Sequence, residues 1–312
     1  MLRNAIAVGL AWRAETEHHE RDGIWLPWIP LVVLTTIATV FRAWLAPWAF
    51  MWALSIAIFL GCKWETWVRA RLAGSRATVA RQIGYFLLWP GMDAPAFLDG
   101  APLPAPPRPS AQEWLAAAAK TLAGGAFVWI AARKVAPANA LLGGWIGMLG
   151  IVLVLHFGIF HLIALAWQIT GVRAKPIMQA PARAASLAEF WGKRWNLGFR
   201  QLTHGLIFQP VRRRFGPSAA TLAAFFVSGL IHDFVISFPA RGGYGLPTGY
   251  FLLQGAGVLF ERSKIGLRMG IDRGARGRAF ALFCVAAPAF WLFHPLFIQR
   301  VMSPFLAWIG SR

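Results

Sequence analysis

Long apolar runs separated by short polar and basic segments dominate the pattern of this chain of 312 residues. A helix needs roughly 20 apolar residues to cross a bilayer, and lipid offers backbone groups no partner outside the helix. Each long run therefore predicts a membrane-spanning helix. We expect seven spans, within a range of six to nine, at residues 25–42, 47–62, 114–132, 141–169, 219–238, 247–261 and 279–298. The expected fold is an all-α polytopic integral membrane protein with one domain over residues 1–312.

Lysine and arginine residues gather in three blocks between these runs. Residues 63–81 hold five of them, residues 173–214 hold nine and residues 262–278 hold six, which makes 20 of the 31 in the chain. Two predicted spans separate each block from the next, so all three blocks lie on one side of the membrane. Basic loops are retained on the cytoplasmic side, where the N-terminus is also expected.

The amino-acid composition is typical of a membrane protein, and this changes the interpretation of the net charge. Hydrophobic residues make up 57% of the chain and charged residues 14%, whereas about a quarter of a soluble domain is charged. A net charge of +19 would suggest nucleic acid in a soluble protein. Here the basic loops face anionic lipid head groups or an anionic substrate, and no nucleic-acid partner is expected. Richness in Ala, Arg and Trp suggests a bacterial source, for which the expected location is the inner membrane.

Two segments do not fit simple spanning helices. Residues 83–90, "IGYFLLWP", are too short to cross the bilayer and predict a re-entrant or interfacial element. They lead into a proline-rich stretch, residues 91–110, whose prolines lack amide donors and restrict the backbone. This stretch is expected to be a cytoplasmic loop. The second segment, residues 186–200, lies within the largest basic block.

The second segment reads "SLAEFWGKRWNLGFR". Ser186 and Glu189 have the spacing of a capping box, which predicts the start of a helix. Aromatic residues then recur at steps of three and four, while the cations lie largely elsewhere, as in an amphipathic helix in the membrane interface. Asn196 would lie beside Trp195 near the buried side, where an amide more often joins two helices than catalyses a reaction.

The predicted span 219–238 carries His232 and Asp233 deep within an apolar run. Ionisable groups at such depth are costly and suggest a function. Helical spacing places Ser228 on the same face as His232, whereas Asp233 points about a third of a turn away. The residues alone leave two interpretations of His232 open, a catalytic base or a structural hydrogen-bond donor.

Other candidate groups favour structural roles. His156 and His161 are five residues apart and do not form the metal-binding pair of a helix, and neither cysteine lies at a metal-ligand spacing. No metal site is expected. Serine-hydrolase, P-loop and zincin motifs have no counterpart in the sequence. The remaining histidines are also expected to be structural: His18, His19, His204 and His294.

The segment "FWGKRWN", followed by a span with "SGLIHDF", resembles the two diagnostic segments of the membrane-bound O-acyltransferase family, most closely its wax-synthase-like branch. The matching patterns, FW-x-x-RWN and SG-x-x-H, lie within residues 186–238. The resemblance implies that His232 and Asn196 are the two catalytic positions. It departs at Asp233, where wax-synthase-like members often have Glu, and this leaves the acceptor open.

The implied chemistry suits these residue types. A neutral imidazole accepts the proton of an alcohol that attacks a thioester, and Asn196 orients the acceptor or donates to the developing oxyanion. The expected co-substrate is acyl-CoA, with no other cofactor, and the acceptor is a hydrophobic alcohol. Supporting roles are expected for Asp233, Ser228 and Trp195. The residues expected to bind the phosphates of acyl-CoA are Lys193, Arg194, Arg212, Arg213 and Arg214.

Two alternatives to a wax or neutral lipid ester synthase remain. One keeps the mechanism but transfers an acyl or acetyl group to a glycan or metabolite. The other is a transporter that uses His232 and Asp233 as a proton-coupled site. Such a transporter would usually show similarly broken spans in two halves, and the sequence has no such symmetry.

Overall fold

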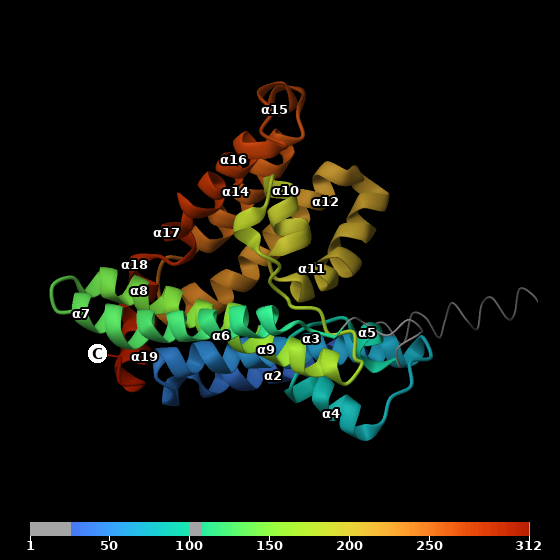
Figure 1. Ribbon diagram of the computed structural model, residues 1–312, viewed down its shortest axis with the longest axis horizontal. Coiled ribbons are helices and arrows are strands. Elements are labelled where there is room, and N and C mark those ends of the chain that lie inside the picture. Colours follow the sequence, from blue (N-terminus) through green and yellow to red (C-terminus); the bar gives the residue numbers. More distant parts are fainter. Residues whose placement is uncertain (1–25, 100–107, 312) are drawn as a thin grey trace, which may run out of the picture.

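The computed structural model describes residues 26–99 and 108–311, and every regular element within these ranges is a helix (Figure 1). The predicted all-α membrane fold is confirmed. The predicted side of the N-terminus, the roles of His18 and His19, and part of the proline-rich loop fall outside the described residues.

The first part of the chain, up to Ile169, forms three long helical runs and several shorter helices, where η marks a 3-10 or π turn. In chain order the elements are η1 (Leu26–Trp28), α2 (Ile29–Val40), η2 (Phe41–Trp44), α3 (Pro47–Leu72), α4 (Val79–Leu87), α5 (Ala94–Leu98), α6 (Ala111–Ala126), η3 (Phe127–Ala132), α7 (Arg133–Val135), α8 (Ala140–Val152), η4 (Leu153–Ile159) and α9 (Phe160–Ile169).

The second half contains the segment singled out from the sequence. Its elements are η5 (Pro181–Arg183), α10 (Leu187–Glu189), η6 (Phe190–Arg194), α11 (Leu197–Thr203), η7 (His204–Phe208), α12 (Gln209–His232), η8 (Asp233–Ser237), α13 (Phe238–Ala240), α14 (Leu246–Glu261), α15 (Lys264–Met269), α16 (Gly274–Ala286), α17 (Ala289–Leu292), α18 (Pro295–Phe297), η9 (Ile298–Met302) and α19 (Ser303–Trp308).

Five of the seven predicted spans coincide with helical runs that are long and apolar enough to cross a membrane. Among the described residues these runs are Pro47–Leu72, Ala111–Val135, Ala140–Ile169, Leu197–Ala240 and Gly274–Leu292. The predicted spans 25–42 and 247–261 correspond to shorter helices, Ile29–Trp44 and Leu246–Glu261. Apolar runs therefore identify helices, whether or not these are long enough to cross a membrane.

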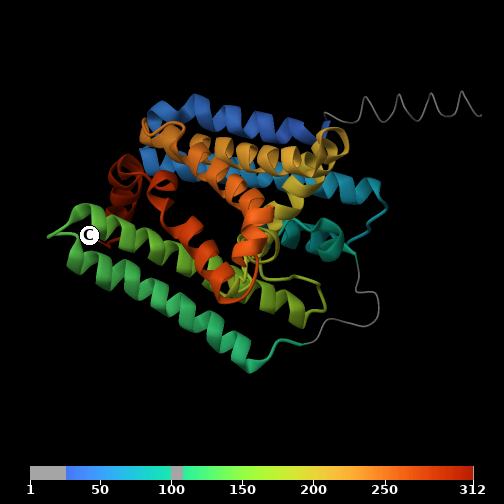
Figure 2. The same cartoon turned by 90° about the horizontal axis from the view of Figure 1, so that it is seen from above.

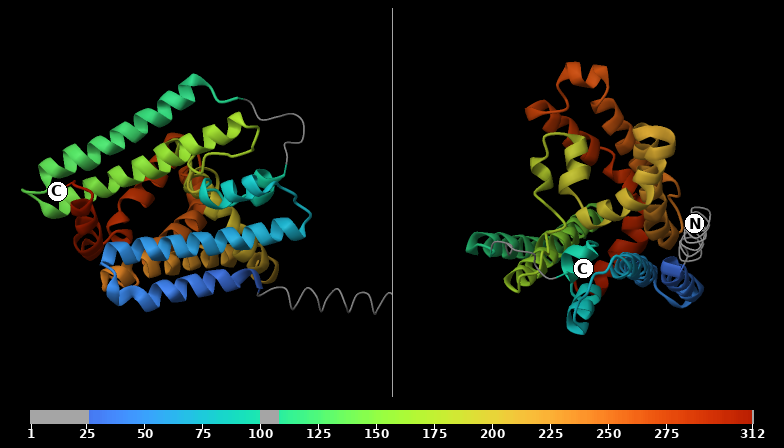
Figure 3. Two further views of the ribbon diagram at one scale, coloured as in Figure 1. Left: turned by 90° about the horizontal axis from the view of Figure 1, so that it is seen from below. Right: turned by 90° about the vertical axis from the view of Figure 1, so that its right-hand side faces the viewer.

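The long helices are arranged on three sides of the C-terminal turn η9 and its neighbouring elements. α2 packs on α3 along one side, and α6 packs on the η4 turn of the α8–α9 run along the other (Figures 2 and 3). The C-terminal turn η9 contacts both α3 and α8, so it joins the two sides. On the third side, α12 lies against α14, and these two helices hold the segment with the candidate reacting groups.

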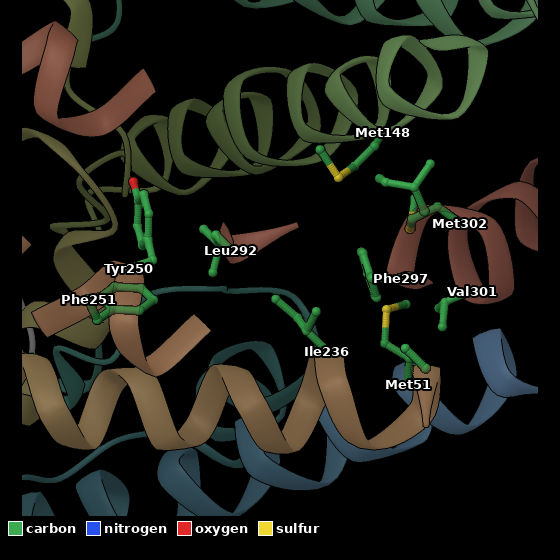
Figure 4. Close-up of a cluster of buried hydrophobic side chains, with 11 residues drawn as sticks. Met51, Met148, Ile236, Tyr250, Phe251, Leu292, Phe297, Val301 and Met302 are labelled. Carbon is green, nitrogen blue, oxygen red and sulfur yellow. The ribbon is translucent and has the colours of Figure 1, made fainter. Parts of the chain in front are cut away.

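A cluster of buried apolar side chains lies where these three sides meet. Figure 4 shows that it draws residues from α3, α8, η8, α14 and the C-terminal helices. Burial of large apolar side chains contributes about 1.5 to 3 kcal/mol each when it removes them from water. The labelled members are Met51, Met148, Ile236, Tyr250, Phe251, Leu292, Phe297, Val301 and Met302.

The predicted re-entrant element consists of α4 and a buried turn that is fastened from within the protein. Lys63 of α3 is fully buried and donates through Nζ to the carbonyl oxygen of Gly91. Its ammonium also lies 3.5 Å from the ring centroid of Tyr85, an attractive cation–π arrangement. The turn is therefore held against α3, whereas its depth in the membrane stays a prediction.

Gly229 allows α12 and α14 to approach closely. A Cβ atom at this position would lie 2.7 Å from the Cα atom of Thr248. Because this neighbour is backbone, it cannot move aside as a flexible side chain would. The glycine of the SG-x-x-H pattern thus has a packing role that is separate from the chemistry of His232.

We predict that Gly229→Ala destabilises the protein by about 1 to 3 kcal/mol, because overpacking forces α12 and α14 apart. The thermal unfolding midpoint of the purified protein in detergent measures this change. Gly205→Ala is the matched control, since a Cβ at Gly205 meets no atom within 4 Å, and its midpoint should not fall. Equal midpoints for the two variants would contradict the packing role.

Candidate active site

A helix begins at Ser186, as predicted. The Ser186 hydroxyl oxygen accepts from the Glu189 amide at 3.0 Å, and the Glu189 carboxylate accepts from the Ala185 amide at 2.7 Å. The prediction of one amphipathic helix through Arg200 is wrong, however. Helical structure ends at Arg194, and Trp195 is extended. The break separates residues 187–194, which we call the aromatic segment, from α11.

Asn196 reverses the chain at this break. Its backbone is left-handed, with φ 40° and ψ 61°, a conformation that Asn tolerates better than most residues. The Asn196 Oδ1 atom accepts from the Phe199 amide at 3.4 Å and so caps α11. Because Oδ1 is engaged in this way, the Nδ2 amino group is the part of the side chain that remains to donate to a substrate.

Residues 177–179 form hydrogen bonds with the chain on both sides of the reversal. The Gln179 amide donates to the Arg194 carbonyl at 2.8 Å, and the Leu197 amide donates to the Ile177 carbonyl at 2.9 Å. These bonds satisfy backbone groups that the broken helix leaves free. Because residues 177–179 lie outside the segment 186–200, the periodicity of that segment could not reveal the break.

Two buried polar residues of α14 fasten the aromatic segment. The Glu261 carboxylate accepts from the amides of Leu187 and Ala188, at 2.5 Å and 3.2 Å. Gln254 is fully buried and accepts from the Trp191 indole N–H at 3.3 Å. α10 is therefore capped by a side chain from a distant part of the sequence, which the sequence analysis missed.

His232 is held in one tautomer by the backbone of its own helix. The Nδ1 atom lies 2.7 Å from the Ser228 carbonyl oxygen, and a carbonyl oxygen only accepts, so Nδ1 carries the proton. In a neutral imidazole the other nitrogen, Nε2, then has a free lone pair. The ring also packs on Phe251, with 4.4 Å between centroids. These two contacts hold the imidazole in a defined orientation.

Asp233 serves a different part of the structure. Its carboxylate accepts from the Ser237 hydroxyl at 2.9 Å, the Gly245 amide at 2.8 Å and the Thr248 amide at 3.0 Å. These bonds hold the loop that enters α14. The sequence prediction that Asp233 points away from the imidazole agrees with this geometry, since all its described hydrogen bonds are to residues 237–248.

Two cavities meet at His232, Asn196 and Phe199. The first has a volume of about 360 Å³ and runs between α11, α12 and α14. The second has a volume of about 480 Å³ and runs between α3, the end of α4 and the α8–α9 run. Since the three shared residues line both cavities, a molecule in either one reaches the imidazole and the amide of the same site.

The two cavities open onto different surroundings. Arg200 and Arg262 are exposed and line the first cavity, and both belong to basic blocks predicted to be cytoplasmic. The second cavity has mainly apolar walls. It reaches Ile56, Leu87 and Leu88, whose side chains are 53%, 72% and 57% exposed, as expected for residues that face lipid.

The other predicted site residues divide into two groups. Ser228 and Trp195 line the first cavity. The predicted phosphate-binding cations do not line either cavity. Arg194 instead pairs with the Glu189 carboxylate at 2.7 Å, and the others are exposed: Lys193, Arg212, Arg213 and Arg214. Arg200 and Arg262, which the sequence prediction did not include, line the first cavity instead.

Comparison with known proteins supports the resemblance carried by the two motifs. Residues 174–253 match the model of the membrane bound O-acyl transferase family. A probable long-chain-alcohol O-fatty-acyltransferase 2 of Arabidopsis thaliana is 31% identical over 148 residues, which cover 44% of this chain and 43% of that protein. The long-chain-alcohol O-fatty-acyltransferase of Simmondsia chinensis is 32% identical over 143 residues, or 42% and 40% of the two chains.

An acyl-CoA–sterol O-acyltransferase 1 of Arabidopsis thaliana is also similar, with 29% identity over 171 residues that cover 48% of this chain and 49% of that protein. The chain thus covers less than half of the length of each of these relatives. The family-matched segment contains Asn196, His232 and the first half of α14, which contribute to the site.

The Glu189 carboxylate yields a prediction about pH. The Ala185 amide lowers the pKa of Glu189 from its usual value of 4.5, and Arg194 lowers it further. Since the pKa is lower in the folded state, the charge stabilises the fold above about pH 4.5, and this stabilisation is lost as pH falls through the folded pKa. Glu189→Gln keeps an acceptor oxygen but removes the charge. Unfolding midpoints of the two proteins should therefore converge on acidification from neutral pH; a constant difference would contradict this role.

Proposed function

We propose that this chain transfers a fatty acyl group from acyl-CoA to a hydrophobic alcohol, because residues 174–253 match the membrane bound O-acyl transferase family. The product is a wax or neutral lipid ester. The observation that carries the proposal is the meeting of two cavities at His232 and Asn196. The names of the relatives, long-chain-alcohol and sterol O-acyltransferases, agree with it.

His232 acts as the general base in this proposal. The free lone pair on Nε2 takes the proton of the acceptor hydroxyl while its oxygen attacks the thioester carbonyl carbon. The Asn196 Nδ2 group donates to the oxyanion that develops on the carbonyl oxygen. A C–O ester bond forms, the C–S bond breaks, and the imidazolium returns its proton to the departing coenzyme A thiolate.

The first cavity is the proposed entrance for acyl-CoA. Arg200 and Arg262 at its edge suit the phosphates of coenzyme A, because guanidinium groups bind phosphate oxygens in a bidentate manner. The walls beyond them are aromatic, including Trp191 and Phe225. The thioester can therefore leave water while its charged portion stays near the solvent. Acyl-CoA is the co-substrate, and we propose no further cofactor.

The second cavity is the proposed entrance for the acceptor. Its exposed edge, at Ile56, Leu87 and Leu88, is apolar, so a long-chain alcohol can enter from the bilayer without crossing water. Such walls offer few groups for a glycan hydroxyl and thus favour a lipid acceptor over a sugar. We place the protein as a multi-pass protein of a bacterial inner membrane, with the coenzyme A entrance on the cytoplasmic side.

Variants of the two reacting positions test the proposed function. We expect His232→Ala to lower ester formation from labelled acyl-CoA and long-chain alcohols by about 10² to 10⁴-fold. Asn196→Gly preserves the left-handed backbone but removes the amide, and we expect a loss of about 10² to 10³-fold, the loss seen when an oxyanion donor is removed. Unfolding midpoints serve as the control for folding. Unchanged ester formation by purified His232→Ala protein would overturn the proposal.

A second pair of variants tests the acyl-CoA entrance. Arg262→Gln removes a cation at the edge of the first cavity, and we expect the KM for acyl-CoA to rise about tenfold, the effect of one lost charge-assisted hydrogen bond. Arg213→Gln is the matched control, because Arg213 is exposed and does not line either cavity. A rise in the KM for acyl-CoA in Arg213→Gln alone would instead favour the triplet Arg212–Arg214, predicted from the sequence, as the phosphate-binding residues.

A further inference from the structure

The second cavity holds polar side chains that the proposed reaction does not use. Trp52 of α3 and His156 of η4 both line it, in walls that are otherwise mainly apolar. The Trp52 Nε1 and His156 Nδ1 atoms are buried, and neither has a hydrogen-bond partner among the described residues. Buried polar groups of this kind are uncommon and call for an explanation.

His156 differs from His232 although both lie on helical runs. The His232 Nδ1 atom donates to the carbonyl oxygen four residues earlier. His156 lies within a π turn, Leu153–Ile159, and its Nδ1 atom makes no such bond in the described part of the chain. The protein therefore holds one imidazole in a single tautomer and leaves the other able to donate or to accept. Single π turns within helices are frequent at functional sites.

The chemistry of Trp52 and His156 defines which hydrogen-bond partner their buried nitrogen atoms need. An indole N–H only donates, whereas a neutral imidazole either donates or accepts. A carbonyl or hydroxyl oxygen is a partner that suits either group. An apolar cavity that opens toward lipid would receive such an oxygen on a long-chain molecule, and the hydrogen bond would remove the penalty of leaving the buried nitrogen atoms unpaired.

We propose that Trp52 and His156 form a polar subsite that binds a second oxygen of the acyl acceptor. The preferred acceptor is then a long-chain alcohol with a hydroxyl or carbonyl oxygen farther along its chain, rather than a plain alkanol. His156 is a specificity residue that contacts the substrate away from the reacting hydroxyl. This inference rests on the proposed function, since it assigns the second cavity to the acceptor.

A positional series of acceptors tests the subsite. Purified protein receives labelled acyl-CoA with a plain primary alkanol or with keto-alkanols of equal chain length, whose carbonyl stands at successive carbons. We expect kcat/KM for the best keto-alkanol to exceed that for the alkanol by about tenfold, the effect of one added hydrogen bond. His156→Leu should abolish this preference through KM, so that the ratio of kcat/KM for the keto-alkanol to that for the alkanol falls to about one. Trp52→Phe should reduce it.

His161→Leu is the matched control, because His161 lies on the same helical run but does not line either cavity, and the preference should persist. A preference that survives in His156→Leu, or equal use of all acceptors by the wild type, would overturn the subsite while leaving the acyltransferase in place. Binding of a labelled long-chain ketone without a hydroxyl gives a readout that needs no turnover. Binding to the wild type that His156→Leu does not weaken would also overturn the subsite, even if no acceptor were esterified.

Discussion

The reversal of the chain at Asn196 decides where the candidate reacting groups lie. A continuous helix through this position would carry the amide along one face of an interfacial anchor. The left-handed residue instead ends one helix and starts the next, so the amide stands where the two cavities meet. Two backbone hydrogen bonds with Ile177 and Gln179, and one from the Asn196 amide to the Met178 sulfur, hold this conformation. The site therefore depends on a neighbouring irregular segment as much as on its own sequence.

Buried polar residues hold the surrounding elements in the same way. Glu261 caps α10, Asp233 holds the loop before α14, and Lys63 fastens the turn at Gly91. Each joins a helix to a segment that lacks regular backbone pairing. Because an unpaired polar group in an apolar interior is costly, these contacts specify the arrangement of the helices more sharply than apolar packing alone.

The sequence predicts many of the helices, but it does not predict features that depend on contacts between distant segments. Apolar runs predicted five long helices, Ser186 predicted a helix start, and His232 was selected by its depth in such a run. The break at Asn196 was missed because aromatic residues continue with helical spacing on both sides. Arg200 and Arg262 were missed because they are far apart in the sequence and line one cavity only in the folded protein, whereas Arg212–Arg214 form a conspicuous cluster in the sequence.

The central claim is that acyl-CoA and the acceptor reach one site from two different cavities. A structure of the protein with a non-hydrolysable thioether analogue of acyl-CoA in lipid nanodiscs tests it most directly. We expect the phosphates to lie against Arg200 and Arg262, with the sulfur next to His232 and Asn196, while the cavity edge at Leu87 and Leu88 stays open to lipid. An analogue whose phosphates lie instead at the Leu87 edge, or whose sulfur lies away from His232, would contradict it.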